Sequence, residues 1–250
     1  MMIRGPSWNR DLAYHARAQY RMLRRPSSVM IHGVHVKIDQ AWPADLRDGL
    51  YRGTYESGEA RVLRATLRPD DRYLEVGAGI GVISTIACQI VGAERVTSFE
   101  ANPKLVRVAA HTLLDNGFYT PAIEHAILGE TDGPRAFYVH DVFWESSLLL
   151  TPGAREITVP GRSWNGELER LRPSYLMIDA EGGEADLLNQ RLPDGVRAVC
   201  VEMHPARIGH EGVQRLLQEL MEQGFVLDTS LSGGQVCYLS RSEPDTRSQL

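Results

Sequence analysis

The feature that most constrains this chain is a glycine-rich turn, GAGIG at 77–81, which separates two apolar runs. The run before it, residues 73–76, predicts a buried strand, and the run after it, residues 82–91, predicts a helix that ends before Gly92. Glycines allow a tight turn and let a ligand lie directly against the backbone, where side chains would block it. The pattern therefore predicts an α/β fold with a ligand site at this strand–helix turn.

Strands and helices continue to alternate after this turn. Helices are predicted from Pro103, with Asn102 as the cap, and over 211–223, where apolar residues recur every three or four positions. Further strands are predicted at 95–99, 122–128, 175–179, 196–203, 225–229 and 235–239. The alternation predicts a Rossmann-like, doubly wound, mostly parallel seven-stranded sheet, and the Ser-Gly-Gly turn between the last two strands predicts an antiparallel C-terminal hairpin.

An arginine-rich segment, residues 1–27, precedes these elements. It is typical of a solvated helix that covers a pocket or pairs two subunits, as in a homodimer; the alternative is an arm for a membrane surface or a polyanion. Residues 29–38 predict one or two short strands around Gly33. We therefore expect an N-terminal arm with lead-in strands over 1–50, a main domain over 51–240 and a flexible tail over 241–250.

Composition narrows the class of partner. The net charge of −5 argues against nucleic acid, because phosphate binding needs a basic surface. No apolar run approaches the roughly 20 residues that cross a bilayer, and the N-terminus lacks the apolar stretch of a signal peptide. The three cysteines have neither disulfide nor zinc spacing. We expect a soluble cytoplasmic protein with a small-molecule partner and no integral membrane segment.

Two acidic residues flank the glycine turn and the next strand. Glu75 lies just before the turn, and Glu100 closes the second strand, 25 residues later. A carboxylate at that position can accept hydrogen bonds from both ribose hydroxyls of an adenosine group. The ends of two neighbouring parallel strands thus predict an adenosine-containing cofactor.

Two classes of cofactor use this layout. A dinucleotide fingerprint needs a small residue at position 82, where this chain has Val82, and Glu75 would place a negative charge near bound phosphates. S-adenosylmethionine has no phosphate and carries an amino group and a sulfonium, which an acidic site tolerates. The residues favour S-adenosylmethionine, with a nicotinamide-dependent oxidoreductase as the alternative.

The chain resembles the class I S-adenosylmethionine-dependent methyltransferases, and more narrowly the FkbM family, over about residues 50–240. The resemblance lies in YLEVGAGIG at 73–81, FEANP at 99–103, MIDAEGGEADLL at 177–188 and VEMHP at 201–205. The family favours Asp and Asn where this chain has Glu75 and Ala78. The resemblance implies an O-methyltransferase domain acting on a small or medium natural-product, sugar or lipid acceptor. The cofactor-binding residues would be Tyr55, Glu75, Gly77, Ala78, Gly79, Gly81, Glu100, Ala101, Asn102 and Asp179.

A second acidic cluster follows two later strands. Asp179 ends one strand, and Glu202 and His204 close the next on one face, so the fold predicts that they meet. A histidine beside a carboxylate is a suitable proton acceptor. We predict His204 as the catalytic base, with Asp179 placing the acceptor hydroxyl and Glu202 orienting the imidazole.

Other interpretations of these residues stay open. Asp179, Glu202 and His204 could instead hold magnesium or manganese, although no ligand spacing demands a metal. Glu181 either shapes the acceptor pocket or orients the glycine turn, and Glu184 is most simply a helix cap. The aromatic and serine-bearing segment 143–148 could line the acceptor pocket. The protein could also be a noncatalytic binding module, which intact Asp179 and His204 argue against.

Overall fold

A computed structural model describes residues 8–119, 123–140 and 153–241. These residues fall into two compact units, which divide between Ser57 and Gly58. The first unit holds α1 (Trp8–Arg24), the antiparallel pair β1 (Ser28–Ile31) and β2 (Val34–Lys37), and α2 (Ala44–Arg52). The predicted strands on either side of Gly33 are confirmed. None of the helices in the described ranges is long and apolar enough to cross a membrane.

The second unit is built on a seven-stranded sheet. Its strands, in spatial order, are β11 (Phe225–Leu227), β12 (Val236–Arg241), β10 (Ala198–Glu202), β9 (Tyr175–Ile178), β3 (Tyr73–Val76), β4 (Val96–Glu100) and β5 (Ile123–His125). The strands from β10 to β5 are parallel, whereas β12 runs antiparallel to both β10 and β11. This order confirms the predicted Rossmann-like, mostly parallel sheet with an antiparallel C-terminal hairpin.

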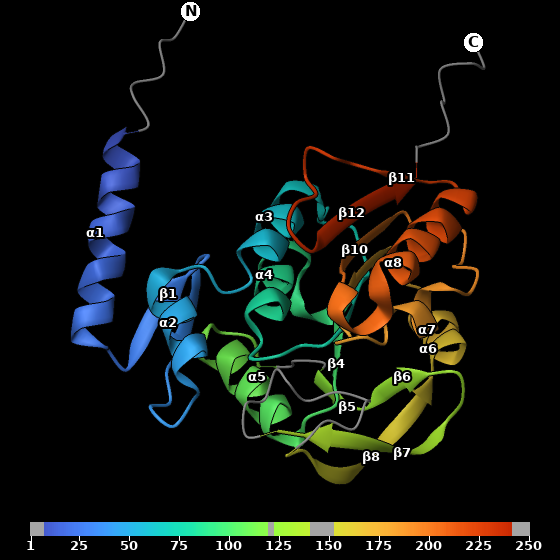
Figure 1. Cartoon of the computed structure of the whole chain (residues 1–250), viewed down its shortest axis with the longest axis horizontal. Helices are drawn as coiled ribbons and strands as arrows, with labels where there is room; N and C mark the ends of the chain where they lie inside the picture. The colour runs from blue at the N-terminus through green and yellow to red at the C-terminus, as the bar shows by residue number, and fades with distance from the viewer. Residues whose placement is uncertain (1–7, 120–122, 141–152, 242–250) are drawn as a thin grey trace, which may run out of the picture. The chain divides into compact units, whose positions relative to one another are not determined.

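Helices cover both faces of this sheet (Figure 1). One face carries α3 (Ser57–Thr66), α4 (Val82–Val91) and α5 (Pro103–Asp115), and the other carries α6 (Trp164–Leu171), α7 (Glu184–Leu188) and α8 (Pro205–Glu222). A short 3-10 turn, Ala93–Arg95, leads from α4 into β4. Alternate strand residues pack against the second helix layer, in a core that includes Leu74, Trp164, Leu176, Ile178, Leu187, Val199, Val201, Leu216, Leu220 and Leu239.

The structure differs from the sequence expectation after β5. The single strand expected over 122–128 is two strands, β5 and β6 (Ile127–Gly129), in different sheets. The reason is that β4 ends at Glu100, whose carbonyl accepts from the Ala126 amide, so β4 offers no partner beyond that point. There β6 pairs with β8 (Arg155–Ser163), which also pairs with β7 (Gly133–Val139). This three-stranded sheet was not predicted, because β7 and β8 are largely exposed and bury few apolar side chains.

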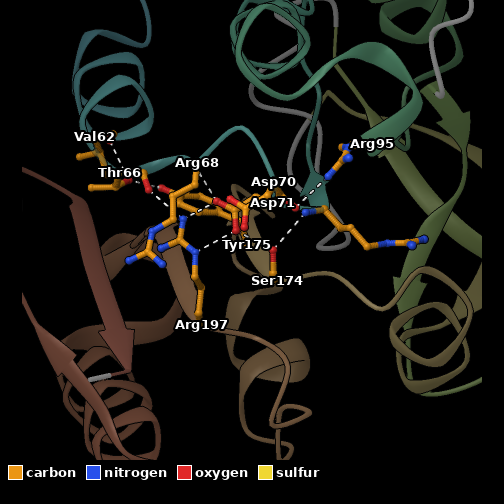
Figure 2. A network of polar contacts seen from close by, with 10 residues as sticks. Val62, Thr66, Arg68, Asp70, Asp71, Arg95, Ser174, Tyr175 and Arg197 are labelled. Atoms are coloured by element: carbon orange, nitrogen blue, oxygen red, sulfur yellow. Dashed lines mark hydrogen bonds and ion pairs between the residues drawn. The ribbon is translucent and has the colours of Figure 1, made fainter. Parts of the chain in front are cut away.

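The amino ends of the central strands are joined by a buried polar network (Figure 2). Asp71, which precedes β3, is 3% exposed and forms a two-pronged ion pair with Arg197, which precedes β10. The same carboxylate accepts from Ser174 Oγ at 2.6 Å and from the Arg68 amide at 2.7 Å. Arg197 also donates to the Thr66 carbonyl at 2.8 Å. The segments that lead into β3, β9 and β10 are thus tied to one carboxylate.

Candidate active site

The glycine turn lies at the carboxyl end of β3 and is bound to the neighbouring strand. The amides of Gly77 and Ala78 both donate to the carbonyl of Phe99, at 2.8 and 3.1 Å. Gly77 has φ +88°, and a Cβ there would lie 2.0 Å from the carbonyl oxygen of Asp179. Only glycine fits such a close approach. The turn is therefore in direct contact with the end of β9, where the second acidic cluster begins.

The third glycine of the turn has a packing role. Gly81 has φ +83°, and a Cβ there would lie 2.8 Å from the Cα of Ala109. Helix α5 therefore packs directly on the start of α4. Both helices begin at the same edge of the sheet, because each follows one of the parallel strands β3 and β4.

Glu100 ends β4 and lies against the turn. Its Oε2 accepts from the Gly79 amide at 2.9 Å, and its Oε1 accepts from the Asn102 amide at 2.7 Å. Burial raises the pKa of this carboxyl to about 7, although the two amides oppose that shift. Asn102 in turn caps α5 through the Lys104 amide, as predicted.

The predicted cofactor fits these groups. Each oxygen of Glu100 keeps a further lone pair for a ribose hydroxyl. Among the described residues, the buried Nδ2 of Asn102 has no hydrogen-bond partner, so a donor is available beside that acceptor. The amides of Gly77, Ala78 and Gly79 already donate to protein oxygens, which leaves them poorly suited to a pyrophosphate. The donor set therefore matches S-adenosylmethionine better than a dinucleotide.

Glu75 is placed differently from Glu100. It is 1% exposed and accepts from the hydroxyls of Ser84, in α4, and of Tyr73, the latter at 3.3 Å. Burial raises the pKa of this carboxyl to about 7. Its side chain thus binds α4 to β3 from within the core. A contact between Glu75 and the cofactor stays a prediction, as do those of Ala78 and Ala101.

The structure brings His204 and the acidic residues after β9 together. His204 Nε2 lies 3.6 Å from Asp179 Oδ1 and 3.5 Å from Glu181 Oε2. His204 Nδ1 lies 2.6 Å from Oε1 of Glu184, the first residue of α7. Arg207, one turn into α8, lies 3.4 Å from Glu181. The imidazole is thus surrounded by carboxylates from two directions.

The carboxylate that is hydrogen-bonded to the imidazole is Glu184. The sequence pattern predicted instead that Glu202 orients the imidazole. Glu184 is the first residue of α7, and after the turn at 182–183 its carboxylate reaches Nδ1 of His204. Glu202 acts on His204 through its charge. Short helices such as α7 carry little sequence signal, although an acidic residue directly after a Gly-Gly turn was a visible hint.

Charge and burial oppose each other in this cluster. Burial works against protonation of His204, but the Glu184 hydrogen bond and the charges of Glu181, Glu184 and Glu202 raise the pKa of the imidazole. Burial works against ionisation of Glu184, but hydrogen bonds from His204 and from the Gly182 amide hold the pKa of that carboxyl below its usual range. Burial, helped by nearby Glu59, raises the pKa of Glu202 to about 7. Of these three groups, Glu184 is thus the carboxyl whose ionised form is favoured.

The same residues could hold a divalent cation. One ligand atom each from Asp179, Glu181 and His204 lie within 4.8 Å of one another. Carboxylate and imidazole suit magnesium, manganese or zinc. The sequence pattern indicated Glu202 as the third possible cation ligand, whereas the structure places Glu181 beside Asp179 and His204.

Two predicted parts of the site are not joined to it by the structure. Tyr55 belongs to the N-terminal unit, where its carbonyl lies 2.8 Å from Nε2 of His32. Segment 143–148, expected near the acceptor pocket, lies outside the described residues. Both assignments stay predictions.

Similar proteins are methyltransferases. A protein-L-isoaspartate O-methyltransferase of Salinibacter ruber is 35% identical over 117 residues, which cover 47% of this chain and 44% of that enzyme. The chain thus spans less than half of this relative. Precorrin-6y C5,15-methyltransferase from Geobacter metallireducens is 14% identical, with 75% of this chain and 88% of that chain covered and a TM-score of 0.45. An O-methyltransferase from Bacillus cereus, in complex with SAH, is 11% identical, with 96% and 94% covered and a TM-score of 0.41.

The family comparison covers more than half of the chain. A model of the methyltransferase FkbM domain matches residues 75–227, from the residue before the glycine turn to the end of β11. The match includes Glu100, the acidic segment after β9 and His204. The chain therefore belongs to the FkbM family of S-adenosylmethionine-dependent methyltransferases.

Proposed function

We propose that this methyltransferase acts on a hydroxyl oxygen of a small or medium natural-product, sugar or lipid acceptor, with His204 as the general base. One observation carries the proposal: Nε2 of His204 faces Asp179 and Glu181, while Nδ1 is held by Glu184. The backbone of Asp179 touches the glycine turn at Gly77, so the imidazole lies close to the cofactor loop. A base in that place serves an acceptor that must lose a proton.

The bound cofactor supplies a methyl group on a sulfonium, which already has a good leaving group. Glu100 would hold the ribose, and the turn would hold the adjacent part of the cofactor against its backbone. Asp179 would orient the acceptor hydroxyl, and His204 Nε2 would take its proton as the oxygen attacks. Alignment can supply much of the rate, and a positioned base typically adds about 10²- to 10⁴-fold.

The proposal implies a pH dependence of definite sign. A general base works in its neutral form, and the pKa of His204 is raised by Glu184 and the neighbouring acids. Turnover should therefore increase as pH rises through a value above that of a free histidine, about 6.5. It should fall as the pH drops below it.

A protein acceptor is the second candidate, because the Salinibacter relative is named for isoaspartate methylation. A carboxylate acceptor is already ionised near neutral pH, so it needs no base. Removal of the His204 side chain therefore distinguishes an alcohol acceptor from a carboxylate acceptor. Loss of His204 should abolish methylation of an alcohol but spare methylation of a carboxylate.

The test compares His204→Ala with His210→Ala, since His210 is exposed on α8, the helix that follows His204. Methyl transfer from radiolabelled cofactor would be measured on a panel of sugar, polyketide and lipid hydroxyls and on an isoaspartyl peptide. We expect kcat on the alcohol to fall by about 10²- to 10⁴-fold in His204→Ala alone. Affinity for adenosylhomocysteine, measured by calorimetry, should change by less than about two-fold, because His204 is not placed against the ribose site.

Two results would contradict the assignment. Near-normal turnover of the alcohol by His204→Ala would remove the imidazole from the chemistry. Loss of wild-type activity in EDTA, restored by magnesium, would instead assign Asp179, Glu181 and His204 to a cation.

A further inference from the structure

We propose that Glu184 is a positioning residue that fixes the tautomer of His204, so that Nδ1 carries the proton and the lone pair of Nε2 faces the acceptor. The inference rests on the proposed role of His204 as the base. It assigns to a buried helix-terminal carboxylate a role in the reaction that its position in the sequence does not suggest.

The first support is the geometry of the carboxylate. Glu184 is fully buried, and its Oε1 accepts from the Gly182 amide at 3.0 Å while lying 2.6 Å from His204 Nδ1. The amide of Gly182 therefore anchors the same oxygen that meets the imidazole. A buried charge that is held at two points defines the direction of the hydrogen bond.

The second support is the set of hydrogen bonds at that carboxylate. The Glu184 oxygen that lies 2.6 Å from Nδ1 of His204 is the same oxygen that accepts from the Gly182 amide. With this oxygen as the acceptor, Nδ1 of His204 is the donor. In the neutral imidazole, the other nitrogen is then the acceptor.

The third support is the backbone around His204. His204 precedes α8 as its N-cap residue, but its side chain makes no capping hydrogen bond, and Pro205 follows it. Its carbonyl accepts from the amides of Arg207 and Ile208. The chain after His204 is therefore fixed by the start of α8, while Nδ1 of the ring is held by Glu184.

Glu202 provides a matched comparison for Glu184. Both are acids that raise the pKa of His204, but Glu202 does so by charge, whereas Glu184 does so first by a hydrogen bond. Replacing either by glutamine removes one charge near the ring. Only Glu184→Gln also alters the partner of Nδ1. The charged and titratable groups that face or influence the imidazole are Asp179, Glu181, Glu184, Glu202, Arg207 and, through Glu202, Glu59.

The primary experiment is ¹⁵N NMR of histidine side chains in the full chain, with His204→Asn used to assign the signals. We expect neutral His204 to carry its proton on Nδ1. Glu184→Gln should lower the pKa of His204 by about 1 unit or more, whereas Glu202→Gln should lower it less. Neutral His204 protonated on Nε2 in the wild type would overturn the proposal, and this readout is taken on the wild-type protein.

Kinetics supply the second readout. Glu184→Gln should lower kcat by about 10²-fold or more and should move the pH profile to lower pH, while the dissociation constant of adenosylhomocysteine stays within about two-fold. Glu184→Asp, which keeps the charge, should recover part of kcat. Unchanged kcat and pH profile in folded Glu184→Gln would overturn the positioning role.

The two proposals can fail separately. If His204→Ala retains activity, the imidazole is not the base, although the NMR tautomer can still be Nδ1–H. If His204→Ala is inactive but the imidazole is protonated on Nε2, the base stands and Glu184 loses its role.

Discussion

Two polar clusters lie at opposite ends of the same strands, and they are built in opposite ways. At the amino ends, both oxygens of Asp71 accept from matched donors on Arg197, Ser174 and Arg68 (Figure 2). At the carboxyl ends, acids from three elements surround His204 and Arg207. The first cluster is electrically satisfied, and the second has more negative groups than positive ones.

The pKa shifts follow this difference. Burial disfavours ionised Asp71, yet its hydrogen bonds from Arg197 and Ser174 hold the pKa of that carboxyl below its usual range. Burial raises the pKa values of Glu181 and Glu202, and their partners do not reverse the shift. A satisfied cluster supports the fold, whereas an unsatisfied one is kept because it can bind or react. The comparison therefore predicts that changes at the two ends affect different quantities.

The largest effect on stability should come from Arg197→Met. It leaves Asp71 charged and buried without its main partner, which typically costs about 3–5 kcal/mol. The free energy of unfolding in urea should fall by that amount, while kcat of the protein that remains folded should stay within about two-fold. Arg191→Met is the control, because the Arg191–Asp194 pair is exposed and should contribute about 0–1 kcal/mol. A large loss of kcat in folded Arg197→Met would show that the cluster at the amino ends also serves activity, which contradicts the comparison.

Much of the fold could be predicted from the sequence because its signals are local. The buried strand 73–76, the helix that Asn102 caps and the C-terminal hairpin are each marked by apolar runs, caps or glycine turns. The three-stranded sheet could not be predicted in this way. Strands β7 and β8 are largely exposed and bury only three apolar side chains, Phe137, Val139 and Val159, so they leave a weak pattern in the sequence.

Part of the candidate site could be predicted from the sequence, and part could not. Glu100 and His204 follow strands whose ends meet in any parallel sheet, so their position could be inferred. The contact of Glu184 with His204 depends on the path of a two-glycine turn, which the sequence does not define. The side chain of Glu75 turns into the core toward Ser84, which its position in the motif did not indicate, and its contact with the cofactor stays a prediction.

The second effect concerns cofactor affinity. Glu100→Ala removes a charged acceptor for the ribose hydroxyls and should weaken binding of adenosylhomocysteine by about 1.5–3 kcal/mol. Because the pKa of Glu100 is about 7 without ligand, wild-type affinity should rise with pH between about 6 and 8. Calorimetry would measure both, with exposed Glu130→Ala as the control. Equal affinities in Glu100→Ala and the wild type would refute the ribose assignment.

The smallest effect on stability should come from Glu202→Gln. Whether this variant is more or less stable than the wild type tests the contrast between the two clusters directly. The pKa of Glu202 is about 7 in the folded protein, above the ordinary value of 4.5, so the folded state holds an extra proton between these values. As pH rises through 7, that proton is lost and an uncompensated charge destabilises the fold. Glu202→Gln should therefore be more stable than the wild type at pH 8, by on the order of 1 kcal/mol, and nearly equal to it at pH 5.

Asp71→Asn should behave in the opposite way, because the pKa of Asp71 is lowered. The stability that its charge supplies is fully present above the carboxyl's unfolded pKa, about 3.9, and disappears as pH falls through the lower folded value. Asp71→Asn should therefore lose stability at pH 8 and lose less of it toward acid pH. Urea unfolding at several pH values would compare both variants with Glu169→Gln, an exposed control. If both ends responded to pH with the same sign, the distinction between a satisfied and an unsatisfied cluster would have no energetic basis.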